Sequence, residues 1–401
     1  MNSQIAARHA TATGDYDRWL LLITFLLVGL GAVMIYSSTS VVPPSLTKKN
    51  ITQFFYFKRH LFTMILGFAA MFTAYRLKVE TIQKFALPLL IFSFLLLMLV
   101  FVPAIGISSG GARRWLRLWP STFQPSELVK LSMVIYLAKY MSASDYRTDS
   151  FISFIKPIAV MGTFQVIFLL QPDFGAAISL GIITLAMLFF SGMRLRYLLS
   201  LAAVTVPLII KLIKEPYRWK RVTSFLNPWD DPQGSGFQLV QSFIALGSGG
   251  LRGVGLGDSK QKLLFLPEPH TDFIFSLIGE ELGLIGATAV IILFLLLFFR
   301  GIAITNKAKD GFVYYLSFGL SIMIAFQVLI NFFVVTGLIP TKGLPLPFIS
   351  YGGSSLLVNM AAVGMLLNFS RDLGNRKVYD RTRDMIVRKK ALRTVYRSRR
   401  R

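Results

Sequence analysis

The chain has 401 residues, of which 54% are hydrophobic and only 15% are charged. This composition excludes an ordinary soluble domain and indicates a membrane protein. Because the chain contains no cysteine, disulfides, thiolate metal ligands and a cysteine nucleophile are excluded as well. The formal net charge of +24 predicts an anionic partner such as lipid headgroups, phosphate or nucleic acid.

Apolar runs of about 20 residues predict membrane-spanning helices. We therefore expect an all-α polytopic membrane protein with about ten transmembrane helices. A short N-terminal segment (1–17) precedes the membrane domain (18–370), and a basic tail (371–401) follows it. The predicted spans are 18–38, 58–75, 85–106, 126–142, 155–171, 174–191, 196–212, 273–299, 312–338 and 347–369.

The basic tail predicts the orientation of the chain. Residues 371–401 hold 13 Lys and Arg residues against three Asp residues. Positive charge next to a span favours the cytoplasmic side, and an even number of spans then places both termini in the cytoplasm. No aromatic-rich binding fold accompanies the tail, so we expect contact with lipid and not with nucleic acid.

A large extracytoplasmic loop (213–271) is predicted between helices seven and eight. It contains the amphipathic stretch GFQLVQSFIAL, which is typical of a helix lying on the membrane interface. The glycine-rich stretch GSGGLRGVGLG (247–257) follows. It has neither the flanking strand and helix nor the GK[ST] of a phosphate-binding loop, so we interpret it as a tightly turning loop or a lid over a site.

Polar motifs stand at the starts of the even-numbered helices, which all run from outside to inside. Glu127, Asp173 and Asp272 occupy three of these starts, and PLPFISYGGSS (345–355) precedes the last helix. Free backbone N–H groups and the helix dipole make such ends attractive to anions. We therefore predict an outer site for a phosphate-bearing substrate, with these residues as contacts: Arg113, Arg114, Glu127, Lys130, Asp173, His270, Lys342, Ser350, Gly352, Gly353 and Ser354.

Asp272 has two interpretations. It caps helix eight beside Thr271, or it is a general base in a partly dry, positively charged setting. A single histidine, His270, near scattered carboxylates is weak support for zinc. A Mg²⁺ or Mn²⁺ ion held loosely by carboxylates and pyrophosphate fits the pattern better, and the sequence leaves the metal open.

Four charged residues in the predicted helices also have open roles. Glu127 and Lys130 are three residues apart on one helix, so they form a structural ion pair or contact the substrate. Glu280 lies about 12 Å along the predicted helix from Asp272, which places it deeper in the membrane than the reaction centre. For Glu280 and Glu281 we expect structural polar bonds, because carboxylates inside a membrane require partners.

Five stretches resemble the FtsW/RodA family, also called SEDS proteins. The resemblance extends from the first predicted helix through the tenth. PTKG before SYGGSS is more similar to the cell-division branch, whereas EPHTD replaces the usual EAHTD or ERHTD and keeps the aspartate. The stretches are GARRWLRL…FQPSELVKL (111–131), QPDFGAA (171–177), NPWDDPQGSGFQLVQSFIALGSGGLRGVGLG (227–257), LPEPHTDFIFSLIGEELG (266–283) and IPTKGLPLPFISYGGSSLL (339–357).

The resemblance implies a peptidoglycan glycosyltransferase that uses lipid II, a disaccharide-peptide on undecaprenyl pyrophosphate, with Asp272 as general base. It also implies a class B penicillin-binding transpeptidase as partner, other divisome proteins, and a place in the bacterial cytoplasmic membrane at the division septum. Other readings stay open: the elongation or sporulation branch, a lipid II flippase, or a scaffold that only recruits the transpeptidase. The motifs lie at the predicted outer ends of the helices. This position favours an enzyme over a transporter, since a transporter site is expected near the membrane midplane.

Overall fold

The computed structural model describes residues 16–39, 54–109, 112–118, 121–213, 223–262, 270–341 and 343–371. Lys342, most of the N-terminal segment and all of the basic tail after Arg371 lie outside the described residues.

The described residues form a mostly helical, multi-pass membrane protein. Each of the ten predicted apolar runs coincides with a helix, and the predicted amphipathic stretch of the outer loop is also helical. Five of the helices are long and apolar enough to cross a membrane by length and composition: α2, α8, α13, α14 and the last helix. The helices are α2 (Arg18–Ser38), α4 (Phe54–Arg76), α5 (Val79–Lys84), α6 (Ala86–Leu99), α7 (Pro125–Met141), α8 (Phe151–Leu170), α9 (Phe174–Phe190), α10 (Leu195–Ile213), η1 (Pro228–Asp230), α12 (Phe237–Ser248), α13 (Ile274–Lys307), α14 (Gly311–Val335) and the last helix Gly353–Arg371.

A small antiparallel sheet lies between α6 and α7, in a segment where the sequence predicted a loop after a helix ending at residue 106. Its strands are β1 (Gly106–Ser109), β2 (Ala112–Leu118) and β3 (Ser121–Phe123), in the order β1-β2-β3. In β2, Ala112 and Leu116 are buried while Arg113 and Arg117 are exposed, which is the alternation of a half-buried strand. The prediction of helix to residue 106 was therefore wrong beyond Leu99.

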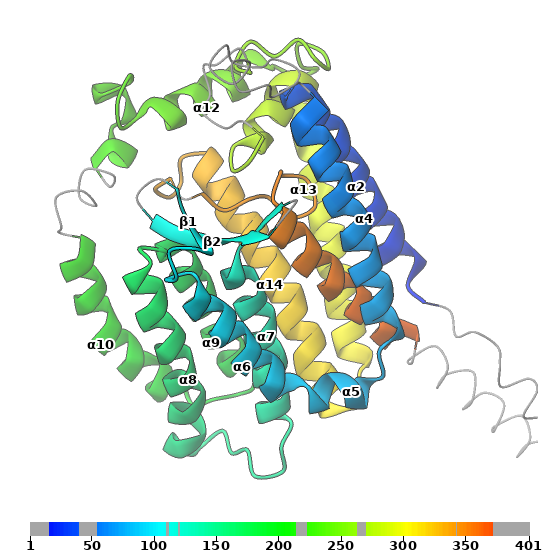
Figure 1. Ribbon diagram of the computed structural model, residues 1–401, viewed down its shortest axis with the longest axis vertical. Helices are drawn as coiled ribbons and strands as arrows, with labels where there is room; N and C mark the ends of the chain where they lie inside the picture. Colours follow the sequence, from blue (N-terminus) through cyan, green and yellow to red (C-terminus); the bar gives the residue numbers. More distant parts are fainter. Residues whose placement is uncertain are drawn as a thin grey trace, which may run out of the picture.

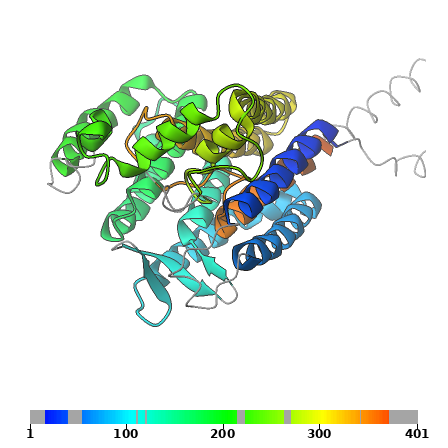
Figure 2. The same ribbon diagram turned by 90° about the horizontal axis from the view of Figure 1, so that it is seen from above.

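The two ends of the described chain meet at one end of the molecule. Asp17 N–H donates to Ser370 Oγ (3.0 Å), and the Asn368 amide donates to the carbonyl of Ala74, just before α5 (3.2 Å). We call this the α5 end; α12 lies at the opposite end, where it crosses over the other helices (Figures 1 and 2). The start of α2 and the end of the last helix thus share one side of the membrane.

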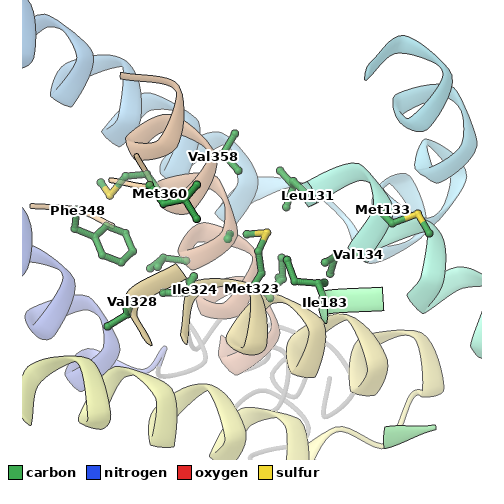
Figure 3. Close-up of a cluster of buried hydrophobic side chains, with 14 of the residues drawn as sticks. Leu131, Met133, Val134, Ile183, Met323, Ile324, Val328, Phe348, Val358 and Met360 are labelled. Carbon is green, nitrogen blue, oxygen red and sulfur yellow. The ribbon is translucent and has the colours of Figure 1, made fainter. Parts of the chain in front are cut away.

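The core lies where α7, α9, α14 and the last helix pack together (Figure 3). Leu131, Val134, Ile183 and Met323 are among its buried side chains. At Gly319 of α14 an added Cβ would lie 2.7 Å from Val134, so this glycine permits the close approach of α14 to α7. Close packing of these side chains holds the ends of the four helices in fixed relative positions.

The helix α13 is broken at Gly283, whose φ of 66° is non-helical. Phe275 lies before the break and Phe294 after it, yet both rings contact Phe332 of α14, with centroids 4.4 and 6.0 Å away. A straight helix would separate positions 275 and 294 by about 28 Å. The chain therefore folds back at Gly283. We call residues 274–282 the re-entrant segment and residues 284–307 the spanning segment.

The direction of the spanning segment fixes the depth of Asp272. Glu281 accepts a hydrogen bond from Ser37, at the α12 end of α2 (2.6 Å). Arg300 donates to Asp17, at the α5 end of the same helix (2.5 and 2.9 Å). The spanning segment thus runs the length of α2 in the opposite direction. The re-entrant segment leads from Gly283 back towards the interior, so the prediction that Glu280 lies deeper than Asp272 was wrong.

Candidate active site

A cavity of about 230 Å³ lies beside the start of the last helix. Four parts of the chain supply its walls: α4, the sheet, the residues just before Asp272 and the loop that leads into the last helix. The wall therefore combines a guanidinium group, hydroxyl groups and a helix N-terminus, which together favour an anionic ligand. The lining residues are Tyr56, Arg59, Thr63, Trp115, Thr122, His270, Thr271, Tyr351, Gly352 and Gly353.

Asp272 follows two of these lining residues and is itself half-buried. Its Oδ1 accepts a hydrogen bond from Thr271 Oγ1 (2.8 Å), and its Oδ2 lies against Gly343, where an added Cβ would be 3.6 Å away. Phe273, not Asp272, occupies the N-cap position of α13, and no side chain caps that helix start. The position therefore differs from that expected of a capping residue.

Asn331 of α14 holds the backbone around Asp272. Its amide donates to the carbonyls of Asp272 (2.7 Å) and Leu344 (2.9 Å). One buried side chain thereby joins the base of the re-entrant segment to the loop that precedes the last helix. Asn331 was missed in the sequence, although a polar residue inside the apolar run of α14 is a signal that could have identified it.

His270 and Tyr351 pack against each other and are both uncharged at neutral pH. Their ring centroids are 5.5 Å apart, and Tyr56 lies 4.9 Å from His270. Burial lowers the pKa of His270 to about 4. Burial raises the pKa of Tyr351 to about 12, although Arg59 works in the opposite direction. Within the described lining, Arg59 is therefore the residue with a full charge at pH 7.

Glu127 and Lys130 form a buried ion pair of 2.7 Å beneath the site. Lys130 also lies 3.5 Å from Gln327 Oε1, and the Gln327 amide donates to the Pro345 carbonyl (3.1 Å) and to Ser355 Oγ (2.8 Å). The pair therefore supports the loop before the last helix, and neither member lines the cavity. Their predicted contact with substrate stays a prediction.

Asp173 and Arg114 lie close to each other in the structure, and neither lines the cavity. Asp173 is the N-cap of α9, where its Oδ1 accepts from the Ala176 N–H (3.2 Å). Arg114 of β2 donates to the carbonyl of Pro172 (2.5 Å), which ties the sheet to the start of α9. Arg113 is exposed on the same strand. Their roles in binding also stay predictions.

The loop before the last helix is held by its own serines. Ser350 Oγ accepts from the Leu346 N–H and Ser354 Oγ from the Gln124 N–H, both at 2.8 Å. Gly352 and Gly353, in contrast, line the cavity, and their predicted contact with a ligand stays a prediction. The predicted motif residues thus divide into loop-holding serines and cavity-lining glycines.

A resident metal ion does not fit the described residues. No group of three or more His, Asp and Glu side chains among them is placed to hold one. Near the cavity, Asp272 is accompanied by a His270 ring whose partners are aromatic rings. We therefore derive no step through Mg²⁺ or Mn²⁺.

The two glutamates bond the segment that follows the glycine-rich stretch. Glu280 accepts from Ser259 Oγ (2.5 Å) and from the Lys260 N–H (2.9 Å). Glu281 bonds Ser37 and lies 3.8 Å from the ammonium group of Lys262. The prediction of structural polar bonds for both carboxylates is confirmed.

Comparison with known proteins decides the family. A profile described as "Cell cycle protein", which stands for FtsW, RodA and SpoVE, matches residues 18–375. The chain belongs to the FtsW/RodA/SpoVE family. This membership agrees with the resemblance carried by the five sequence stretches.

Two relatives show the degree of similarity within the family. The chain is 43% identical over 360 residues to the probable peptidoglycan glycosyltransferase FtsW of Geobacter sulfurreducens, covering 89% of this chain and 96% of that one. It is 42% identical over 357 residues to the stage V sporulation protein E of Bacillus subtilis, covering 88% and 97%. Division and sporulation proteins thus lie at nearly equal distance from this chain.

Solved structures show the same fold. One chain of a peptidoglycan synthase complex, described as coordinating polymerization and crosslinking, has a TM-score of 0.73 and 31% identity, covering 89% of this chain and 98% of that one. The rod shape determining protein RodA of Thermus thermophilus has a TM-score of 0.65 and 28% identity, covering 89% and 97%. The predicted architecture is confirmed by this similarity.

Proposed function

We propose that the chain polymerises lipid II into glycan strands at the outer face of the cytoplasmic membrane. The chain is then a peptidoglycan glycosyltransferase, as the names of its relatives indicate. The observation that carries the proposal is the position of Asp272. This carboxylate stands next to a recessed cavity whose wall contains Arg59 and the N-terminus of the last helix.

In the proposed reaction Asp272 is the general base. It accepts the proton of the sugar 4-hydroxyl of one substrate as that oxygen attacks the anomeric carbon of the growing chain. The bond from the anomeric carbon to the pyrophosphate oxygen breaks, and undecaprenyl pyrophosphate leaves with the electron pair. Arg59 and the free N–H groups at Gly353 are placed to stabilise the negative charge of the leaving group. Arg113 and Arg114 of β2 are proposed to supply further positive charge for the substrate, and the same role predicted for Lys342 falls outside the described residues.

The orientation and partners are part of the same proposal. The basic tail favours the cytoplasm for the α5 end, so the cavity opens on the outer side. A class B penicillin-binding transpeptidase that cross-links the product is the expected partner, and other divisome proteins are expected at the septum. The coordination of polymerization and crosslinking described for the similar synthase complex supports such a pairing. The PTKG stretch before SYGGSS and the predominance of FtsW names among the relatives make septal division the proposed branch, with the sporulation branch as the alternative.

The direct test is polymerisation of labelled lipid II by the purified chain with its transpeptidase. Asp272→Asn keeps the size of the side chain and removes the base, so we expect loss of polymer while the complex still forms. Asp230→Asn, at an exposed position in η1, is the matched control and should polymerise normally. Polymer formation by Asp272→Asn within a few-fold of wild type would contradict the assignment. A wild-type chain that makes no polymer yet moves lipid II across liposomes would favour the transport reading.

A further inference from the structure

The glycine-rich part of the outer loop is built into the break of α13. Residues 249–262, which we call the inserted loop, bond the backbone on both sides of Gly283. Two of its N–H groups donate to carbonyls of the re-entrant segment, and two of its carbonyls accept from the start of the spanning segment. The bonds are Val254 N–H to Glu280 O (3.0 Å), Gly255 N–H to Glu281 O (3.1 Å), Leu284 N–H to Gly250 O (2.9 Å) and Ile285 N–H to Leu251 O (3.2 Å).

Glycines make this insertion sterically possible. A Cβ added at Gly253 would clash with the carbonyl of Glu281, and the φ of Gly253 is +80°. A Cβ added at Gly249 would clash with the carbonyl of Gly279. Gly247, in contrast, has nothing within 4 Å of an added Cβ and no positive φ, so a side chain is tolerated there.

The two carboxylates fasten the same junction by their side chains. Glu280 and Glu281 are each 1% exposed. Glu280 is bonded to the inserted loop, whereas Glu281 joins it to α2 through Ser37. A buried carboxylate without such partners is costly. These bonds therefore strongly favour one arrangement of the junction between the inserted loop and the break at Gly283.

The re-entrant segment transmits this arrangement to Asp272. A helix of this length spans about 13 Å and is rigid. Near its start, Ser276 Oγ lies 2.9 Å from Ser242 Oγ of α12, which donates to the carbonyl of Val335 in α14 (2.8 Å). At its base, Asn331 holds the carbonyl of Asp272. The carboxylate therefore stands at the end of a short helix whose other end is fixed by the inserted loop.

We propose that Glu280 and Glu281 are positioning residues, which act through the re-entrant segment to set the location of the Asp272 carboxylate. The proposal rests on the function proposed above. Reactions of this kind lose on the order of 100-fold in rate when a catalytic group moves by about 1 Å. Removing the bonds that hold the junction at Gly283 should therefore lower kcat. KM should stay nearly unchanged, because the cavity wall contains no residue of this junction.

The first measurement is the rate of lipid II polymerisation by the full chain with its transpeptidase. We expect Glu280→Gln and Gly253→Ala to lower kcat by about 10- to 100-fold with KM within about twofold of wild type. Gly247→Ala is the matched control, and we expect wild-type kinetics for it. Glu281→Gln tests the second carboxylate in the same way.

The second measurement reads the position of the segment without activity. The chain has no cysteine, so Ser242→Cys with Ser276→Cys introduces a single pair that oxidation can cross-link. We expect Glu280→Gln to slow cross-linking of this pair, and we expect the completed cross-link to restore most of the lost kcat.

Wild-type cross-linking together with a lowered kcat in Glu280→Gln would overturn the proposal, and so would an unchanged kcat. If the wild-type chain makes no polymer, the proposed function fails. The cross-linking rates then still show whether Glu280 holds the segment.

Discussion

Removing one charge from the buried Glu127–Lys130 pair should destabilise the protein severely, whereas removing both should not. The two side chains are each 3% exposed and their charged atoms are 2.7 Å apart. A buried charge left without its partner costs about 3–5 kcal/mol of unfolding free energy. Replacing both members by neutral side chains of similar size is often neutral or stabilising. We therefore expect Glu127→Gln and Lys130→Met to be destabilising singly and nearly neutral together.

The assay is unfolding of the purified protein in mixed micelles by increasing SDS, followed by circular dichroism. The exposed pair Arg194–Asp149 provides a matched control, because its side chains are 49% and 59% exposed at 3.8 Å. Arg194→Met should cost no more than about 1 kcal/mol. The four variants of the buried pair form a double-mutant cycle, and we expect a coupling energy of several kcal/mol.

Two results would refute this reasoning. A cost of less than about 1 kcal/mol for Lys130→Met would mean that the ion pair does not hold the fold. A double variant as unstable as the single ones would mean that each residue has other essential contacts. If the double variant is stable but does not polymerise lipid II, the substrate-binding role predicted from the sequence gains support.

Asn331→Leu removes two hydrogen bonds to the backbone beside the cavity, and we expect kcat to fall about tenfold with little change in KM; an equal loss in KM would place Asn331 in binding instead. Gly31→Ala would set a Cβ 2.6 Å from the carbonyl of Phe348, so we expect a marked loss of thermal stability, whereas Gly29→Ala, with nothing within 4 Å, should be silent. Arg114→Ala should slow turnover at limiting lipid II, and high salt should slow turnover by the wild type. Normal rates in both cases would contradict binding of the anionic substrate by basic residues near the site. Truncation before Tyr379 should leave polymerisation in detergent intact, and a large loss would show that the tail is coupled to the site.

The helices were predictable because hydropathy depends on local sequence. Apolar runs of about 20 residues identify helices whatever surrounds them. Glu127 and Asp173 stand at the starts of α7 and α9, as counting spans predicted, whereas Asp272 precedes the re-entrant segment, whose direction the sequence did not reveal. The sheet was less visible, because its strands are short and polar and lie in a segment between two apolar runs that was interpreted as a loop.

The fold-back at Gly283 could not be predicted, because hydropathy measures composition and not direction. Residues 274–307 read as one long apolar helix, and the turn within them depends on backbone bonds from a loop some 30 residues earlier. Gly253 and Gly283 are ordinary loop and helix glycines until the two segments meet. Arg59 was missed for a related reason, since a cation at the start of α4 becomes a cavity residue only through tertiary packing.

The hydrogen bond between Asp17 and Ser370 has a consequence for work with the protein in cells. The chain enters the membrane domain and leaves it at neighbouring points, so reporters attached at the two ends of the described chain, residues 16 and 371, would start from the same corner of the molecule. A donor and an acceptor fluorophore on short linkers at these ends would transfer energy efficiently within one copy. Transfer between copies therefore has to be measured with both labels on the same terminus of different molecules.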